Sequence, residues 1–431
     1  MTGGQPSSHS HWESELLREL VGGLPRTFWA LFTALLVNRA GAFAMILLPT
    51  YLTAGRGTSL AVAGLVTGGY GAGGAVGTLL GGVLADRWGR RKTYLTGTIA
   101  AAILMLALGF AKPLWLIAAL AILIGLMHML PSPAMVAAIV DVTPEHDRPR
   151  AFNLQFWAFN MGAAIAAALA GIVAEFSFFA LFAIDAGMTA LTAVLIWRLV
   201  PETLPKPSHG SAPERGSLGM VLVDRVFLAF VGLTFVLALL TAQSISTVQL
   251  AMSSDGLRPS LFGLVVSVSG ALIVFGQLFV PKLIGARRHA GVLTLSLAII
   301  GFGYSVLAFA DVGWVYLAAA IVWTVGQMFA APANASIIAE LAPWHMRARY
   351  QGVFNLVFPA AFFVAPAIGG WSLQTLGPWH WIVCGALGVA AAVGHLLAEP
   401  ARARRVSADR AVPSTVEPVA AARGLEELAR P

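Results

Sequence analysis

The sequence predicts an all-α membrane protein with twelve transmembrane helices, arranged as two six-helix bundles. Composition is the first observation: of 431 residues, 58% are hydrophobic and only 11% are charged, whereas soluble domains average about 25% charged residues. The second is that apolar residues gather in runs of about 20 or more, the length that crosses a hydrocarbon core roughly 30 Å thick. Since lipid offers the backbone no hydrogen-bonding partner, each run should be a helix that satisfies its own amides.

Twelve apolar runs follow one another, and one hydrophilic interruption divides them six and six. The runs lie at residues 27–54, 59–85, 93–111, 114–140, 151–174, 178–200, 226–252, 260–284, 292–310, 313–341, 351–374 and 379–398. The interruption is rich in Pro, Ser and charge, as expected for a linker. We therefore expect an N-terminal tail, a first bundle, a linker, a second bundle and a C-terminal tail, at residues 1–26, 27–200, 201–225, 226–398 and 399–431.

Lys and Arg residues lie mostly on one side of the predicted membrane. Of the 27, Arg39 lies inside the first run, and only Arg56, Lys112 and Arg258 lie in odd-numbered connections. Positively charged loops stay in the cytoplasm, so both termini are predicted to be cytoplasmic in a multi-pass protein of the cell membrane. The same bias accounts for the formal charge of +7 without a nucleic-acid partner.

The two halves repeat at a constant spacing of 199 residues. The matching positions are Gly64, Pro133, Ala134, Asp141, Pro144, His146, Arg148, Arg150 and Gly171 in the first half, and Gly263, Pro332, Ala333, Glu340, Pro343, His345, Arg347, Arg349 and Gly370 in the second. A parallel repeat of six spans predicts pseudo-two-fold symmetry, with a small molecule bound near mid-membrane between the halves.

The connection between runs two and three holds one carboxylate and four cations. Its motif, Gly-x-Leu-Ala-Asp-Arg-x-Gly-Arg-Arg, is made by Gly82, Leu84, Ala85, Asp86, Arg87, Gly89, Arg90 and Arg91. With this motif, the 6+6 layout and the central linker, the chain resembles the major facilitator superfamily over about residues 27–398. Within that family it looks most like bacterial twelve-span drug/proton antiporters. The resemblance implies a secondary transporter that works by alternating access.

Two features depart from those antiporters. Their span-five signature is reduced here to Gly162, Ala166, Ala167, Ala170 and Gly171, and a better match lies in span eleven at 365–370. The arginine that many of them carry in span four is absent, and His128 is the ionisable group in mid-span. Proton coupling is therefore an expectation of the resemblance and not of these motifs.

The cluster around this connection is predicted to form a cytoplasmic gate. Its members are Gly82, Asp86, Arg87, Gly89, Arg90, Arg91, Asp141 and Arg148. Helix dipoles favour a carboxylate at a helix N-terminus, and the resemblance places Asp86 at the start of span eleven, near Gln351. Arg90 or Arg91 is expected to reach Asp141, and Arg148 to face Asp86. Ordinary anchoring by positive charge is the alternative for the arginines.

Arg39, preceded by Asn38, lies near the middle of span one. A cation there costs about 2.5 kcal/mol or more on insertion scales, so it must face the bundle interior or a wet cavity. We expect an anion contact or a charge partner for a protonatable carboxylate. The alternative is a buried structural pair with Asp185 of span six. If protons drive transport, Asp185 is the candidate carrier, because burial favours its protonated form.

Further polar residues inside the spans are candidates for substrate contact or coupling. His128 can titrate, and its repeat partner is polar too. The others are Gln155, Trp157, Asn160, Gln243, Gln327 and Asn355. Interhelical hydrogen bonds, worth about 0.6 kcal/mol each, are the alternative for such groups. An apolar, aromatic cavity with few fixed charges suits lipophilic or weakly cationic compounds.

Glycines recur every four residues along span two, at Gly69, Gly73, Gly77 and Gly81. Such a row lets another backbone approach closely. We expect it to pack against span eleven, across the interface between the two halves.

We predict a proton-coupled exporter of small lipophilic compounds. Uptake or facilitated diffusion of a small organic anion, suggested by Arg39, and a non-transporting sensor or scaffold stay open. No nucleotide-binding motif, catalytic constellation or metal-ligand spacing occurs, and the one cysteine, Cys384, allows no disulfide framework. We therefore expect no enzymatic activity, cofactor or metal, and a monomer whose partners are a small-molecule substrate, protons and the lipid bilayer.

Overall fold

The structure is a computed structural model and describes residues 22–204, 218–277, 279–285, 287–343 and 346–411. Most of both tails and of the linker lies outside these residues. Within the described part the chain is helical, with no strand. The helices are α2 (Arg26–Ala40), α3 (Leu48–Thr50), α4 (Leu60–Trp88), α5 (Arg90–Phe110), α6 (Leu114–Met129), α7 (Pro131–Val142), α8 (Arg148–Phe176), α9 (Phe178–Leu199), α10 (Leu218–Val223), α11 (Arg225–Gln243), α12 (Thr247–Ser254), α13 (Pro259–Gly276), α14 (Val280–Ile284), α15 (His289–Val306), α16 (Gly313–Leu341), α17 (Arg347–Asn355), α18 (Val357–Leu376) and α19 (Trp379–Ala411).

Eleven helical segments of the described chain are long and apolar enough to cross a membrane. The first predicted span, 27–54, is also present but broken, because α2 ends at Ala40 and α3 begins only at Leu48. Pro49 explains the break, since proline has no amide hydrogen and its ring clashes with the carbonyl four residues earlier. The expected all-α membrane fold is therefore confirmed, with span one discontinuous.

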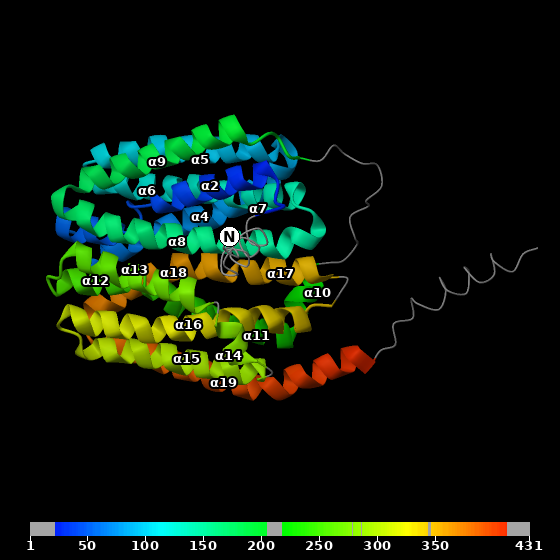
Figure 1. Cartoon of the computed structure of the whole chain (residues 1–431). Coiled ribbons are helices and arrows are strands. Elements are labelled where there is room, and N and C mark those ends of the chain that lie inside the picture. The colour runs from blue at the N-terminus through cyan, green and yellow to red at the C-terminus, as the bar shows by residue number, and fades with distance from the viewer. Residues whose placement is uncertain (1–21, 205–217, 278, 286, 344–345, 412–431) are drawn as a thin grey trace, which may run out of the picture.

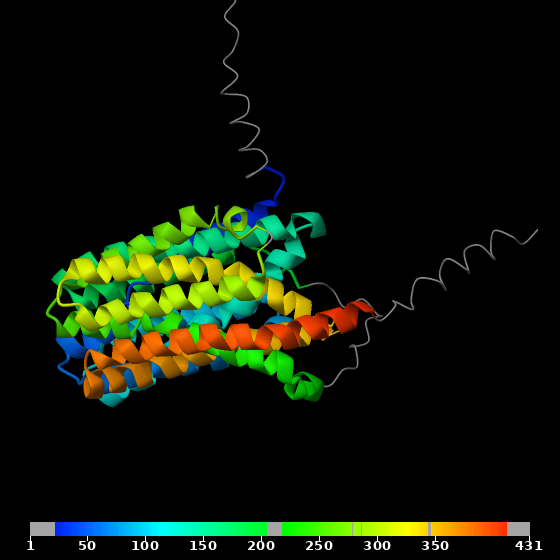
Figure 2. The same ribbon diagram turned by 90° about the horizontal axis from the view of Figure 1, so that it is seen from below.

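The helices run roughly along one axis and form two bundles side by side, α2–α9 and α11–α19 (Figure 1). α2 begins and α19 ends at the same end of the molecule, on the right of Figure 1, which we call the terminal end. We call the opposite end, where α12 lies, the far end. Seen at 90°, α19 extends beyond its neighbours at the terminal end (Figure 2).

Span seven is interrupted at the place that corresponds to the break in span one. α12 begins at Thr247, 199 residues after the start of α3 at Leu48. Before it, the Ser244 hydroxyl donates to the Thr241 carbonyl at 2.6 Å, and the Ser246 hydroxyl donates to the Ala242 carbonyl at 2.9 Å. Such bonds compete with the helix and bend it. The repeat therefore includes the backbone irregularities.

The two bundles meet along two helix pairs, α4 with α18 and α8 with α13. Gly64 of α4 faces the Pro366 carbonyl, and its repeat partner Gly263 of α13 faces the Ala167 carbonyl. A Cβ at either glycine would collide with that oxygen. The same small residue thus permits close approach at both halves of the interface, as the pseudo-two-fold relation requires.

The prediction that the four-residue glycine row faces span eleven was wrong. Gly73, Gly77 and Gly81 lie against backbone carbonyls of α6 and the residue that follows it, within their own bundle. Span eleven instead meets a different face of α4, including Gly68 and Gly71. Helical spacing shows which residues share a face, but it does not show which helix that face meets.

Candidate functional site

A polar cavity of about 70 Å³ lies inside the first bundle. Four of the residues predicted from the sequence, Asn38, Arg39, His128 and Gln155, line it together. The other lining residues are Leu35, Tyr94, Thr98, Pro131, Ser132, Met135 and Phe159. They come from α2, α5, α6, α7 and α8, so the interior of the bundle gathers polar groups that would be costly toward lipid.

Arg39 is the charged group of this cavity. Its guanidinium carbon lies 4.6 Å from the centre of the Phe159 ring, a distance at which a cation is attracted to the aromatic face. Among the described residues it forms no ion pair, and its buried Nε has no hydrogen-bond partner. Arg39 also occupies the last turn of α2, where the helix dipole favours a cation. The Nε of this lining residue is therefore an unsatisfied donor beside the cavity.

Asp185 of α9 lies close by but not in the cavity. It is 1% exposed and accepts hydrogen bonds from the Ala44 amide at 3.0 Å and from the Thr189 hydroxyl at 3.3 Å. Ala44 lies in the unwound stretch of span one, so the carboxylate satisfies a backbone donor that the break leaves free. Asp185 is thus a structural partner, but of the backbone and not of Arg39 in an ion pair.

His128 contacts Tyr70 of α4. Its Nδ1 lies 3.4 Å from the tyrosine hydroxyl, and the two rings are perpendicular, at 89°. This contact joins α6 to α4 beside the cavity. The hydroxyls of Tyr70, Tyr94, Thr98 and Ser132 were not singled out from the sequence, because threonine, serine and tyrosine occur on every face of a membrane helix.

Two predicted residues of α8 lie outside the cavity lining. The Trp157 ring is 39% exposed and stacks on Phe32 at 6.4 Å. The Asn160 amide donates to the Phe156 carbonyl of its own helix at 2.9 Å. Both contacts fit the structural alternative.

The predicted residues of the second bundle are scattered. Gln243 is buried, and its amide lies 3.5 Å from the Ala365 carbonyl. Gln327 is half-buried, and its Nε2 has no hydrogen-bond partner among the described residues. Asn355 is exposed and accepts from Gln351 at 2.9 Å. The structure does not gather these three around one cavity.

The charged motif forms a compact cluster at the terminal end. The Arg90 guanidinium bonds to Asp86 at 2.6 Å and to Asp141 at 3.2 Å, as expected for Asp141. Glu202 accepts from the Arg90 amide at 2.7 Å and so caps the start of α5. It approaches Gly89, whose φ of 106° suits glycine.

Each described ion pair of this cluster stays within the first bundle in this conformation. The Asp86 side chain is 75% exposed, and Gln351 bonds to its own helix, so the expected contact at span eleven is not made. Arg148 is half-buried, its Nε has no partner in the described chain, and it does not bond to Asp86. Arg91 donates to the Trp197 carbonyl. Arg87 is exposed. Gly82 makes no close packing contact, because a Cβ placed on it would meet nothing within 4 Å.

A second cluster, missed in the sequence, ties together the terminal end of the second bundle. Asp224 caps α11 by accepting from the Phe227 amide, and it also accepts from the Tyr350 hydroxyl at 2.6 Å and pairs with Arg405 of α19. Burial alone would raise the pKa of Asp224, but the bonds from Arg405 and Tyr350 outweigh it and hold the pKa below its ordinary value. The cluster fixes the extended part of α19 to the bundle.

The bundles are joined by hydrogen bonds at the far end. The Gln249 amide donates to the Thr50 hydroxyl at 2.7 Å, and these two residues are repeat partners that meet on the pseudo-two-fold axis. Thr53 and Ser253 lie 3.3 Å apart beside them. At the terminal end, by contrast, Asp86, Gln351 and Asn355 are exposed. The interface is closed at the far end.

Two pseudo-symmetric bundles, a closed interface at one end and a polar cavity inside the membrane define a membrane transport protein. The chain matches the model of the Major Facilitator Superfamily over residues 30–358 and 241–430. It belongs to this family, which confirms the resemblance seen in the sequence.

Relatives in the family include transporters of several kinds. The MFS-type transporter YttB of Bacillus subtilis (strain 168) is 30% identical over 358 residues, 80% of this chain and 88% of the relative. A Na⁺, Li⁺, K⁺/H⁺ antiporter of Planococcus maritimus is 25% identical over 88% of this chain and 94% of its own. The multidrug resistance protein MdtH of Enterobacter sp. (strain 638) is 25% identical over 72% and 78%.

Solved transporter structures share the fold at low identity. A POT family transporter in complex with 5-aminolevulinic acid has a TM-score of 0.75 and 16% identity, over 89% of this chain and 97% of that one. A point mutant of the nucleoside transporter NupG has a TM-score of 0.72 and 13% identity, over 86% and 99%. The protein is therefore a multi-pass membrane transporter with this fold.

Proposed function

We propose that the protein exports small lipophilic compounds in exchange for protons, by alternating access. The observation that carries the proposal is the pair of charges at the break in span one. Arg39 faces the cavity without an ion-pair partner in the described chain, and Asp185 holds the unwound backbone beside it. Spanning helices with unwound segments are a common place for substrate and coupling-ion sites in secondary transporters.

The distribution of Lys and Arg supports placing the terminal end in the cytoplasm. With this orientation, the conformation is closed toward the outside at Thr50 and Gln249. Residues of the terminal end, such as Asp86 and Asn355, are exposed toward the cytoplasm. A substrate would then enter from the cytoplasm or the inner leaflet and leave after the far end opens.

Asp185 carries the coupling proton in this mechanism. When it is ionised, its charge offsets that of Arg39; when it is protonated, the region keeps the net positive charge of Arg39. A weakly cationic compound in the cavity is therefore held more tightly while Asp185 is ionised and is released once a proton arrives. This competition produces exchange of substrate for protons.

The same proton acts on the far end through the backbone. Protonation weakens the charge-assisted hydrogen bond that Ala44 donates to Asp185. The segment from Ala44 leads within six residues to Thr50, which holds Gln249 across the interface. Protonation therefore changes the hydrogen bonding of the segment that closes the far end, which links the proton to the conformation of this end. Closure of the terminal end would bring the cluster of Asp86 and Arg90 against the start of span eleven as a gate.

Two relatives support this assignment by their names, one an antiporter that exchanges cations for protons and one a multidrug resistance protein. The cavity walls support it by their chemistry. Leu35, Met135 and Phe159 are apolar and Arg39 is the one permanent charge of the lining, which suits lipophilic compounds of low charge.

Transport in proteoliposomes with an imposed pH gradient tests the proposal, with a lipophilic fluorescent cation as substrate. Asp185→Asn keeps an oxygen that accepts from Ala44 but cannot ionise. We expect it to bind the cationic dye more weakly, and its flux should no longer respond to the gradient. Glu175→Gln, which changes an exposed carboxylate of the same bundle, is the matched control and should keep gradient-driven flux. Gradient-driven export by Asp185→Asn would refute the role of Asp185.

The guanidinium of Arg39, which has no ion-pair partner in the described chain, favours a second candidate, uptake of a small organic anion. An anion would replace the charge of Asp185 when that group is protonated, so anion and proton would move in the same direction. In the same vesicles, an inward proton gradient would then drive organic-anion accumulation, and Arg39→Gln would abolish it. If neither kind of solute moves in any gradient, a sensor or scaffold becomes the better description.

A further inference from the structure

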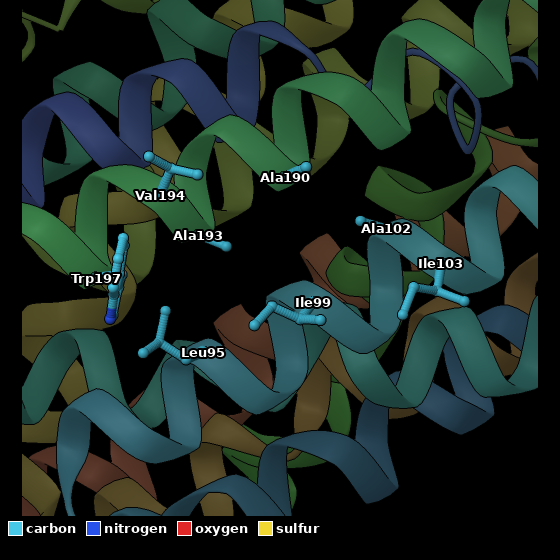
Figure 3. Close-up of a pocket in the computed structure, with 8 residues that line it drawn as sticks. All are labelled: Leu95, Ile99, Ala102, Ile103, Ala190, Ala193, Val194 and Trp197. Atoms are coloured by element: carbon cyan, nitrogen blue, oxygen red, sulfur yellow. The ribbon is translucent and has the colours of Figure 1, made fainter.

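An apolar groove of about 450 Å³ lies between α5 and α9 (Figure 3). Leu95, Ile99 and Ile103 line it from α5, and Ala190, Val194 and Trp197 from α9. It is separate from the polar cavity, because that cavity meets α5 through other residues. Its volume falls in the range of about 300–1,000 Å³ that holds small ligands.

The groove opens on the outer side of the first bundle. α5 and α9 lie at the edge of this bundle that is farthest from the second one (Figure 1), and the side chains of Ile103, Val194 and Trp197 are about half or more exposed. From Leu95 to Ile103 the helix rises about 12 Å. Half of a hydrocarbon core is about 15 Å thick, so the groove is about as long as one leaflet is deep, and it begins at Leu95 in the leaflet at the terminal end, where α5 begins.

Three cations surround the end of the groove that is nearest the membrane surface. Arg91 donates to the Trp197 carbonyl, and the Arg198 guanidinium lies 4.8 Å from the Trp197 ring. Lys92 is exposed one residue further along α5. The nearby carboxylate of Glu202 accepts hydrogen bonds from backbone amides at the start of α5. An apolar channel therefore leads into a positively charged mouth.

We propose that this groove binds an anionic phospholipid of the leaflet at the terminal end. One acyl chain lies along Leu95, Ile99 and Ile103, and the phosphate lies among Lys92, Arg91 and Arg198. Arginine pairs with phosphate through parallel hydrogen bonds, and Lys92 adds a further exposed positive charge. A second copy of the chain is a poorer occupant, because a two-fold contact would bring the same cations together.

Quenching of Trp197 by brominated lipids tests the site in the full-length protein in nanodiscs. The Trp197 signal is the difference between the wild type and Trp197→Phe. Brominated phosphatidylglycerol should quench it at about ten-fold lower mole fraction than brominated phosphatidylcholine. Lys92→Gln combined with Arg198→Gln should remove this preference. Arg225→Gln, an exposed arginine at the terminal end of the second bundle, is the matched control and should keep it.

Other results would overturn the proposal. Equal quenching by both lipids would mean ordinary contact with bulk lipid. Protection of Trp197 from both lipids, together with a dimer captured by cross-linking, would mean that a second copy covers the groove. If the double variant does not fold, native mass spectrometry of the wild type decides. Retained phosphatidylglycerol in excess over phosphatidylcholine supports the site, and equal retention or none contradicts it.

Discussion

Replacing Gly64 by alanine should open the far end of the protein. A Cβ there would collide with the Pro366 carbonyl and lie 3.1 Å from the Gly370 Cα, so α4 and α18 must separate. Overpacking of this kind costs about 1–3 kcal/mol, and the cost falls only on the conformation in which these helices touch. The gain in helix propensity, about 1 kcal/mol, applies to both conformations and cancels. The ratio of closed to open far ends should therefore fall about 5- to 150-fold.

Disulfide cross-linking between Thr53→Cys and Ser253→Cys measures this ratio. The two hydroxyls lie 3.3 Å apart across the closed interface, and Cys384→Ser removes the one native cysteine. The rate of cross-linking should fall in Gly64→Ala. In the control Gly187→Ala it should not change, because a Cβ there would meet nothing within 4 Å.

Two results would refute this reasoning. If Gly64→Ala cross-links as fast as the parent, contact at this glycine does not decide which end is closed. If Gly187→Ala slows cross-linking as much, the effect comes from alanine in any membrane helix. The repeat supplies a further check, since Gly263→Ala would collide with the Ala167 carbonyl and should act like Gly64→Ala.

Three further predictions concern the carboxylates. Asp185→Ala should lower the free energy of unfolding by about 1–3 kcal/mol, because the Ala44 amide loses its acceptor. Asp185→Asn should change the free energy of unfolding little, so equal losses for the two variants in thermal unfolding would contradict this role of Asp185. Because the pKa of Asp224 is held below its ordinary value, the stability that its pair with Arg405 contributes is present above the unfolded-state pKa and is lost as pH falls through the folded-state pKa. Amide exchange at the terminal end of α19 should therefore quicken in acid, and Asp224→Asn should show fast exchange at every pH. Asp86→Ala should change stability by less than about 1 kcal/mol, since this side chain is 75% exposed, yet it should increase the fraction open at the terminal end in cross-linking; an unchanged fraction would argue against the gate.

The spans and the repeat could be predicted because they depend on composition and on spacing along one chain. The helix that each face of a span meets could not be predicted in this way. The row of Gly73, Gly77 and Gly81 meets α6 rather than span eleven, and nothing in its period distinguishes the two helices. The break in span one had a signal in Pro49, but the distant residue that satisfies the freed amide, Asp185, shows only in three dimensions.

The site was partly predictable for a physical reason. Polar groups avoid lipid, so these side chains could be expected in a bundle interior before the helix packing was known. Four of them, Asn38, Arg39, His128 and Gln155, do lie together there. The same reasoning does not show whether a polar group faces a cavity or bonds to its own helix. Asn160, which donates to the backbone four residues earlier, shows this limit.

The two halves share their mechanics but not their charges. Close glycine contacts and broken spans recur in both bundles, with Gly64 and Gly263 as repeat partners at the interface. The positions that correspond to Arg39 and Asp185 are Ala238 and Cys384, and neither carries a charge at neutral pH. Rocking of the bundles can therefore be nearly symmetric, whereas the response to a proton must arise in the first bundle. A single ionisable site beside one broken span is enough to bias a symmetric interface, because it alone changes the free-energy difference between the two closed ends.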